Sequence, residues 1–149
     1  MSDGDLIKLY SQRILALSAD IPWTDRLTAP HATAKKRSPL CGSTVTVDLD
    51  LDQTGRILRY GQDVKACALG QASAAISGAR MIGRTRDEVA TARDQLMAML
   101  KEGGPVPAAP FDGYDVLEPA RDYKNRHASI MLTLDATLEA FDKALEAAA

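Results

Sequence analysis

The stretch TVTVDLDLDQTGRILRYGQDV, residues 44–64, carries the clearest structural pattern in the chain. Valine and leucine alternate with threonine and aspartate over residues 44–51, which is the two-residue period of a β-strand with one buried and one solvent-exposed face. A short turn containing glycine follows, and residues 56–64 can pair back on the first strand with Leu58 and Tyr60 on its buried side. The sequence therefore predicts a β-hairpin.

Amphipathic helices are expected before and after this hairpin, because apolar residues recur there every three or four positions. This spacing is found over residues 3–21, 85–103 and 125–147. Thr85 and Glu88 have the spacing of a capping box, which marks the start of a helix. Residues 68–82 are rich in alanine, serine and glycine, which suits a further helix packed closely against the sheet.

Two segments lack a regular apolar spacing. Residues 23–39 contain small polar residues and a basic run, so we expect a loop there. Residues 103–119 are rich in proline and should form an ordered flap. Together these elements predict an α+β fold, in which a small antiparallel sheet of two to three strands is covered on one face by four to five helices.

Length and composition fit one globular domain over residues 1–149, with 46% hydrophobic and 26% charged residues. The formal net charge of −2 is unlike that of proteins that bind nucleic acids or anionic membranes. No apolar run approaches the roughly 20 residues of a membrane span, and the start of the chain lacks a signal-peptide pattern. We therefore expect a cytoplasmic protein with no nucleic-acid and no membrane partner. The sequence motifs of hydrolases and of P-loop proteins are absent.

The two cysteines flank the hairpin. Cys41 lies just before the first strand and Cys67 opens the helix after the second, so the hairpin should bring both thiols to one end of the sheet. A thiolate at a helix N-terminus is favoured by the unpaired N–H groups there, which promotes nucleophilic attack and metal binding. The alternative is that both cysteines are inert core residues, since free cysteine is often buried.

A histidine offers a third ligand. His127 stands at the start of the last predicted helix, whereas His31 lies in the irregular segment before the hairpin. His127 is therefore the better candidate for a metal ligand, and the alternative is a core or capping histidine.

Three short strings stand in order around the hairpin: PLCGS at residues 39–43, CALGQAS at residues 67–73 and RHASIML at residues 126–132. In this combination they resemble the NifU-like, or IscU-type, scaffold proteins of iron-sulfur cluster assembly. The resemblance covers nearly the whole chain.

The resemblance implies a non-enzymatic protein that receives sulfur from a cysteine desulfurase, holds iron or an iron-sulfur cluster transiently, and passes it to apo-proteins. It implies Cys41, Cys67 and His127 as the metal-binding and cluster-binding residues. Ala128 stands where the family has its third cysteine, and Ser43 stands where the family usually has an aspartate. Three donors leave one position open in a four-coordinate site.

Two other functions remain compatible with the sequence. One is a zinc-binding sulfur acceptor for a cysteine desulfurase, because residues 103–119 resemble the longer connection of the SufU-like branch, whose members bind zinc. The other is a degenerate, metal-free interaction module of the same fold. The chaperone-recognition string LPPVK of one branch is absent, and residues 122–125 occupy its place. The basic run 35–37, near the predicted cysteine end, is either a solvated face or a surface that steers an acidic partner.

Overall fold

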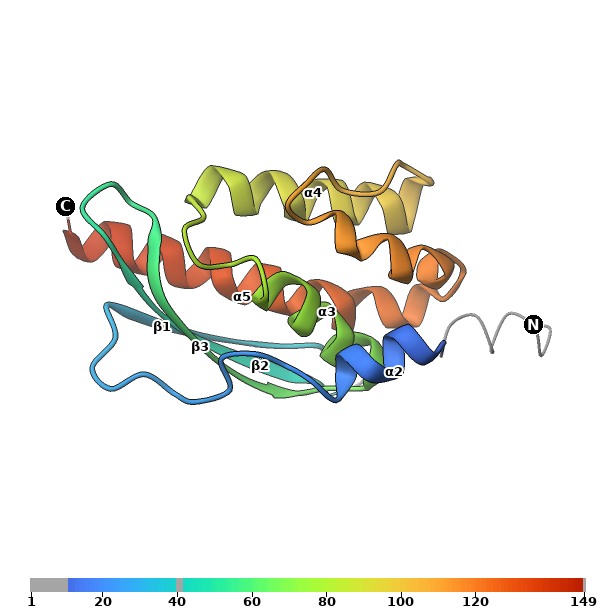
Figure 1. The fold of residues 1–149 in the computed structure, drawn as a ribbon, viewed down its shortest axis with the longest axis horizontal. Coiled ribbons are helices and arrows are strands. Elements are labelled where there is room, and N and C mark those ends of the chain that lie inside the picture. Colours follow the sequence, from blue (N-terminus) through green and yellow to red (C-terminus); the bar gives the residue numbers. More distant parts are fainter. Residues whose placement is uncertain (1–10, 40–41, 149) are drawn as a thin grey trace.

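The computed structural model describes residues 11–39 and 42–148 of the chain. It contains a three-stranded antiparallel sheet with helices packed on one side, which confirms the predicted α+β fold (Figure 1). The elements in chain order are α2 (Gln12–Ser18), β1 (Ala32–Arg37), β2 (Thr44–Leu51), β3 (Ile57–Lys65), α3 (Ala68–Gly78), α4 (Arg86–Glu102), the 3-10 helix η1 (Asp112–Asp122) and α5 (Lys124–Ala148). Within these described ranges, no helix combines the length and apolarity that a membrane span requires.

The predicted hairpin is formed by β2 and β3, and β2 is the central strand of the sheet. The prediction that Leu58 shares the buried side of Tyr60 is wrong. The pairing register shifts between Asp50 and Leu51, so that Leu51 lies opposite Ile57. Such an irregularity changes the alternation of side chains, and it leaves Leu58 58% exposed while Ile57 is buried.

The first strand, β1, lies within the segment that we expected to be a loop. Its sequence, ATAKKR, lacks the large apolar residues that give a strand a visible two-residue period. The strand forms because it pairs with β2 along its whole length, from Ala32 opposite Leu49 to Arg37 opposite Thr44. Pairing with an existing strand overrides a weak local preference.

The segment 103–119 also differs from the expected flap, because residues 112–122 form η1. Tyr114, Leu117 and Ala120 of η1 are fully buried, so this short helix is held by its packing. Residues 68–82 do form a helix, but α3 ends at Gly78, four residues before the predicted end.

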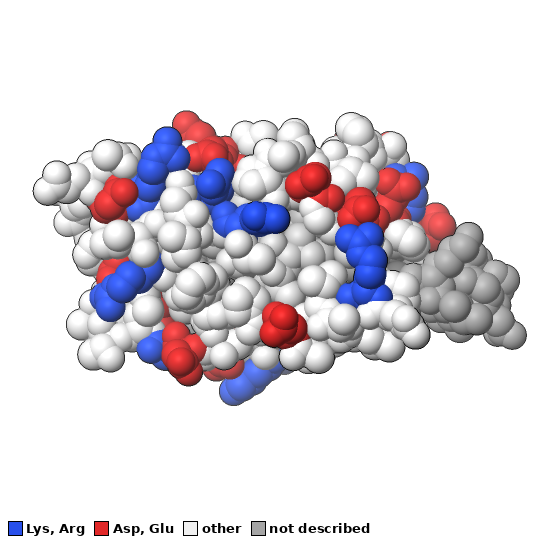
Figure 2. Space-filling model, in the orientation of Figure 1, with Lys and Arg blue, Asp and Glu red and all other residues white. Residues whose placement is uncertain are grey.

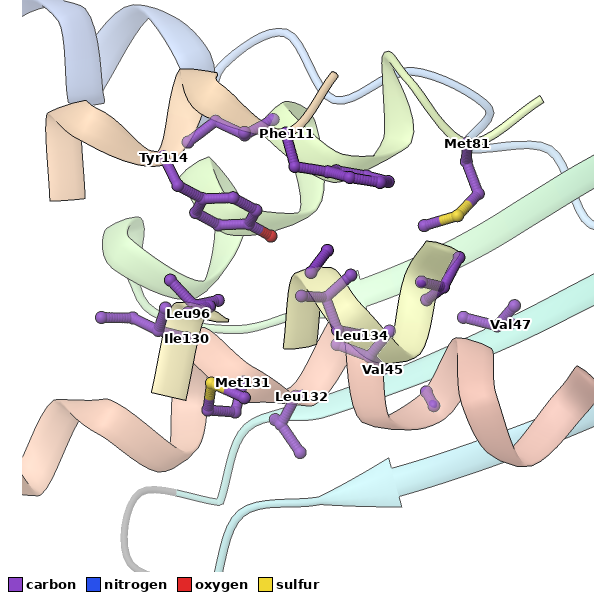
Figure 3. Packing of buried hydrophobic residues seen from close by; sticks show 14 of the residues in the cluster. Val45, Val47, Met81, Leu96, Phe111, Tyr114, Ile130, Met131, Leu132 and Leu134 are labelled. Carbon is purple, nitrogen blue, oxygen red and sulfur yellow. The ribbon is translucent and has the colours of Figure 1, made fainter. Parts of the chain in front are cut away.

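The apolar core lies between the sheet and the helices (Figure 3). Val45 and Val47 of β2 point toward α5, where Leu134 packs in the same layer. A second layer, which includes Leu96 of α4 and Tyr114 of η1, covers α5 and α3 from the other side. The predicted helix 125–147 is confirmed by α5, which lies between these two layers.

The face of the sheet that points away from α5 is not fully exposed to solvent, contrary to our expectation. Asp48 of β2 projects from this face and is completely buried. Residues 19–31, which we call the strap, run along this side of the sheet (Figure 1). Arg26 and the backbone N–H of Leu27, both in the strap, donate hydrogen bonds to the Asp48 carboxylate.

Candidate functional site

Cys67 lies at the start of α3, as the sequence predicts. It is the N-cap residue of this helix, with φ −66° and ψ 170°, and it follows the end of β3 by two residues. Its carbonyl accepts a hydrogen bond of 2.9 Å from the backbone N–H of Gln71. The residue is half-buried. Cys67 therefore combines a fixed backbone with partial exposure to solvent.

The thiol of Cys67 contacts the hydroxyl of Ser129 in α5, with Sγ and Oγ 3.4 Å apart. Ser129 in turn donates a hydrogen bond of 3.3 Å to the hydroxyl of Ser43, which lies just before β2. Both serines are buried, with 1% and 5% of their surfaces exposed. Three segments that are distant in the sequence thus meet behind the Cys67 sulfur.

Ser129 is a site residue that our sequence analysis missed, although it lies in the RHASIML string that carries the family resemblance. Its contact with Cys67 depends on the close approach of α3 to α5. A Cβ atom at Gly70 of α3 would lie 2.6 Å from the Ser129 hydroxyl oxygen, which is closer than real contacts allow. Glycine at position 70 therefore makes room for the Ser129 side chain.

His127 is buried, with 2% of its surface exposed. Its Nε2 atom lies 2.9 Å from the carbonyl oxygen of Ala120 and 3.1 Å from that of Arg121, so Nε2 carries the ring proton and donates it to these acceptors. In the neutral ring this leaves Nδ1 as an acceptor, and within residues 11–39 and 42–148 this buried atom has no hydrogen-bond partner. A histidine held by one ring nitrogen and unprotonated at the other is the arrangement that metal sites use.

The other ligand candidates are less directly placed. Cys41 lies outside the described residues, so its predicted closeness to Cys67 stays a prediction. Ser43, two residues after Cys41, reaches the Cys67 sulfur through Ser129. Within residues 11–39 and 42–148, no three His, Cys, Asp or Glu side chains gather closely enough to hold a metal ion.

His31 lies at the opposite end of the sheet from Cys67. It precedes β1, whose first residue, Ala32, pairs with Leu49, whereas Ser43 precedes the other end of β2. The Nδ1 atom of His31 accepts a hydrogen bond of 3.0 Å from the backbone N–H of Leu51. The structure therefore places His31 far along the sheet from Cys67, and the assignment of His127 as a ligand stays a prediction.

Comparison with known proteins gives a close relative of known structure. No family model matches the chain, and no curated protein matches it. The crystal structure of the N-terminal part of a nitrogen-fixing NifU-like protein from Brucella abortus matches with a TM-score of 0.92 and 42% sequence identity, covering 95% of this chain and 98% of that chain.

A more distant structure shares the fold. It is a protein from the thermophile Fervidobacterium islandicum AW-1, described as an iron-sulfur cluster assembly scaffold protein for the SUF system. It matches with a TM-score of 0.79 and 20% identity over 91% of this chain and 98% of that chain. The likeness to the Brucella protein, at 42% identity over nearly the full length of both chains, is much stronger. This chain belongs to the family of NifU-like proteins.

Proposed function

We propose that this protein is a scaffold or carrier in iron-sulfur cluster assembly. It holds iron or an iron-sulfur cluster transiently at Cys41, Cys67 and His127 and passes it to apo-proteins. The observation that supports this most is the position of Cys67, half-buried at the N-cap of α3, in a chain that is 42% identical to a NifU-like protein. The protein binds its cargo and does not turn it over, so the proposed function is not enzymatic.

The donor types suit this cargo. Iron-sulfur clusters are bound by thiolates, with histidine as an occasional replacement. His127 supplies a buried, unprotonated Nδ1 that has no hydrogen-bond partner among the described residues, and Cys67 is partly exposed. Ala128 has no donor atom, so the set of three leaves one coordination position open. An open position favours release of the cargo to a recipient protein.

We propose a cysteine desulfurase as the source of sulfur. In this step a thiolate of the scaffold attacks the outer sulfur of the desulfurase persulfide, one S–S bond breaks as another forms, and the desulfurase cysteine leaves as a thiolate. Cys67, which is partly exposed, can act as this acceptor, and Cys41 is the alternative acceptor.

Metal and sulfide analysis of protein purified without oxygen tests the proposal. We expect iron with acid-labile sulfide in the wild type after anaerobic reconstitution, loss of both in Cys67→Ser, and retention of both in His31→Ala, because His31 lies at the other end of the sheet.

Other outcomes select the alternatives. Stoichiometric zinc without sulfide indicates the zinc-binding sulfur acceptor for a cysteine desulfurase. A protein that binds neither ion indicates a metal-free interaction module. Equal losses in Cys67→Ser and His31→Ala contradict the assignment of His127 as the ligand.

A further inference from the structure

Three basic residues lie at the Cys67 end of the sheet, on the face that points away from α5. The register places Arg37, Thr44 and Lys65 in one row across the three strands, and Lys35, Thr46 and Asp63 in the row behind it. The row of Arg37, Thr44 and Lys65 forms the end of the sheet, and the chain segments that contain the two cysteines begin just beyond it. Lys65 precedes Cys67 by two residues, and Arg37 precedes Cys41 by four.

The direction of these side chains follows from the strand alternation. Ala34 and Val45 are buried under α5, and Lys36 pairs with Glu139 of α5 at 3.8 Å, so these residues face the helices. Their neighbours Lys35 and Arg37 therefore face the other way, and both are exposed. We call the group Lys35, Arg37 and Lys65 the tip surface.

The cations of the tip surface form no ion pairs with the described residues. Within the described part of the chain, none of the three lies within ion-pair distance of a carboxylate, although the adjacent Lys36 does. The two rows hold three cations and a single carboxylate, that of Asp63, while the whole chain has a net charge of −2. On the face drawn in Figure 2, basic and acidic side chains are instead interspersed.

The first turn of α5 adds positive charge at the same end of the molecule. It contains Lys124 and Arg126 and no acidic residue. Positive side chains at a helix N-terminus oppose the helix dipole and reduce stability. This helix start lies near Cys67, because Ser129 contacts the Cys67 sulfur. Lys124 and Arg126 therefore lower the stability of the folded protein, and we take this as an indication that their charge serves in binding.

We propose that the tip surface docks an acidic surface of the protein that exchanges sulfur or cluster with Cys67. This inference rests on the proposed function and names the chemistry of the partner at the same site. Any protein that reaches the Cys67 sulfur must cover part of the adjoining surface, and carboxylates at that place on the partner would pair with Lys35, Arg37 and Lys65. Complementary charge of this kind raises the rate of association and fixes the orientation of the partner.

A protein is favoured over the other anionic partners. A patch of three cations on a chain of net charge −2 is too small to follow a nucleic-acid backbone. Membrane-binding surfaces combine basic residues with apolar ones, and the two rows contain only basic, threonine and aspartate residues.

The local field can be measured with small thiol reagents. In a Cys41→Ser background Cys67 is the remaining cysteine, and its rate of modification is compared for dithiobis(nitrobenzoate), a dianion, and for neutral dithiodipyridine. Lys35→Glu with Arg37→Glu should slow the dianion about threefold to tenfold at low salt and leave the neutral reagent unchanged. Arg80→Glu with Lys101→Glu makes the same change in net charge at exposed positions elsewhere. The inference is overturned when both pairs of substitutions slow the dianion equally.

Association with a purified cysteine desulfurase tests the docking itself. We expect binding to the wild type to weaken with added salt, to weaken at least about tenfold in Lys35→Glu with Arg37→Glu, and to persist in the control pair. Equal binding of the two charge-reversed proteins overturns the docking surface and leaves the proposed function intact. Absence of binding to the wild type counts against the proposed function instead. Binding of an oligonucleotide or of phosphatidylglycerol vesicles that is lost with the same substitutions overturns the choice of a protein partner.

Discussion

Ser129 connects the Cys67 thiol to the buried hydroxyl of Ser43. The Ser129 hydroxyl has a single proton, which it donates to Ser43 in this structure, so the Cys67 thiol is the donor in its contact with Ser129. Once the thiol has lost its proton, the Ser129 hydroxyl can turn from Ser43 to the sulfur, and a hydrogen bond to a charged group is worth more than one to a neutral group. Ser129 thereby acts as a positioning residue that holds the sulfur of Cys67 in place.

Ser129→Ala should slow the alkylation of Cys67 by iodoacetamide about threefold to tenfold, because it removes the hydroxyl donor beside the sulfur, a loss of about 1 kcal/mol. The rate is measured on the metal-free protein by mass spectrometry of the Cys67 peptide. Ser18→Ala serves as the control, since the Ser18 hydroxyl donates to the Leu15 carbonyl of its own helix. An unchanged rate in Ser129→Ala would show that the hydroxyl does not act on the sulfur.

Ala128 lies between His127 and Ser129 and is half-buried. Ala128→Cys adds a thiolate donor where the set of Cys41, Cys67 and His127 leaves a position open. We expect the reconstituted variant to lose iron and sulfide to a chelator about tenfold more slowly than the wild type, which corresponds to about 1.4 kcal/mol of binding free energy.

The absorbance of the cluster, followed under anaerobic conditions, measures this loss. Ala79→Cys places the same new thiol at an exposed position just after α3 and should leave the rate unchanged. Equal rates for Ala128→Cys and the wild type would mean that the fourth position is already filled or that the site does not hold the cluster.

The sequence predicted the positions of Cys67 and His127 but not that of Ser129. The positions of the first two follow from local patterns, namely a helix that begins after a hairpin and a helix with a continuous apolar face. The contact between Cys67 and Ser129 arises from the approach of α3 to α5 at Gly70. A contact between segments so distant in the sequence cannot be predicted from the spacing of apolar residues along the chain.

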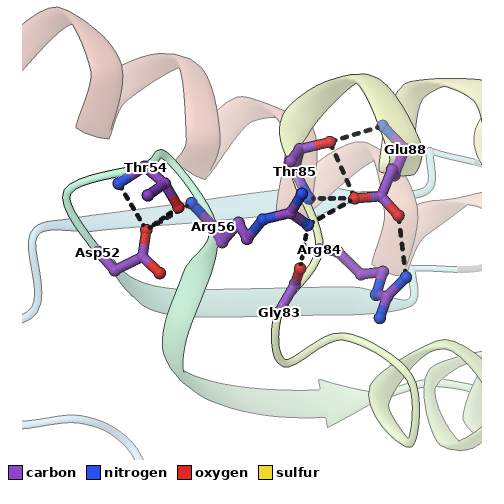
Figure 4. Close-up of polar contacts among 7 residues, drawn as sticks. All are labelled: Asp52, Thr54, Arg56, Gly83, Arg84, Thr85 and Glu88. Atoms are coloured by element: carbon purple, nitrogen blue, oxygen red, sulfur yellow. Dashed lines mark hydrogen bonds and ion pairs between the residues drawn. The ribbon is translucent and has the colours of Figure 1, made fainter.

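The start of α4 is the best example of an element end that local sequence determines (Figure 4). The predicted capping box is present: Thr85 Oγ1 accepts a hydrogen bond from the Glu88 N–H at 3.2 Å, and the Glu88 carboxylate accepts one from the Thr85 N–H at 3.1 Å. Glu88 also binds Arg84 and Arg56, and Arg56 donates to the carbonyl of Gly83. Arg56 lies in the β2–β3 turn, so the start of α4 is stabilised by a tertiary contact as well as by the local capping box.

Glu88→Ala should lower the free energy of unfolding by about 1–2 kcal/mol, because it opens the capping box and leaves Arg56 and Arg84 without their carboxylate. Urea denaturation measures the change. Asp87→Ala is the matched control, since it removes the same charge from the same helix turn. A loss in Asp87→Ala as large as that in Glu88→Ala would mean that the helix dipole, and not the hydrogen bonds, is responsible.

The elements that the sequence did not predict share a physical property. Strand β1 is held by its pairing with β2, and η1 is held by the burial of Tyr114 and Leu117. Strand β1 has no large apolar residue that would reveal its period. In η1 the buried residues Tyr114, Leu117 and Ala120 recur every three positions, which is not the α-helical period, and Pro119 lies among them. By contrast β2 and α5 bury continuous apolar faces, and for these two the predicted elements match the structure.

The strap covers part of the sheet face that points away from α5. We expected the aspartates of β2 to be solvated, but strap and sheet together bury Asp48. Burial on its own raises the pKa of Asp48, but hydrogen bonds from Arg26, Thr33 and the Leu27 N–H outweigh it and hold the pKa below its ordinary value. The charged form of Asp48 therefore stabilises the folded state.

The sign of the pH dependence follows from this lowered pKa. A group whose pKa is lower in the folded than in the unfolded state contributes stability that is complete above the unfolded pKa, about 4 for aspartate, and is lost as the pH falls through the folded pKa. The attachment of the strap to β2 through Asp48 should consequently weaken in acid and stay constant from about pH 5 to pH 8.

Asp48→Asn should lower the free energy of unfolding at pH 7 by about 2–3 kcal/mol, because the amide cannot replace the charged acceptor of Arg26, Thr33 and Leu27. Asp20→Asn, an exposed position in the same strap, should change it by less than about 0.5 kcal/mol. As a second test, the free energies of unfolding of wild type and Asp48→Asn are compared by urea denaturation at decreasing pH, starting from pH 7. The difference between wild type and Asp48→Asn should begin to shrink below about pH 4, where Asp48 of the unfolded wild type takes up a proton, and should be lost as the pH falls through the lower pKa of the folded state. A difference that stays constant into acid would show that Asp48 acts through its shape and packing, and that its charge does not hold the strap on the sheet.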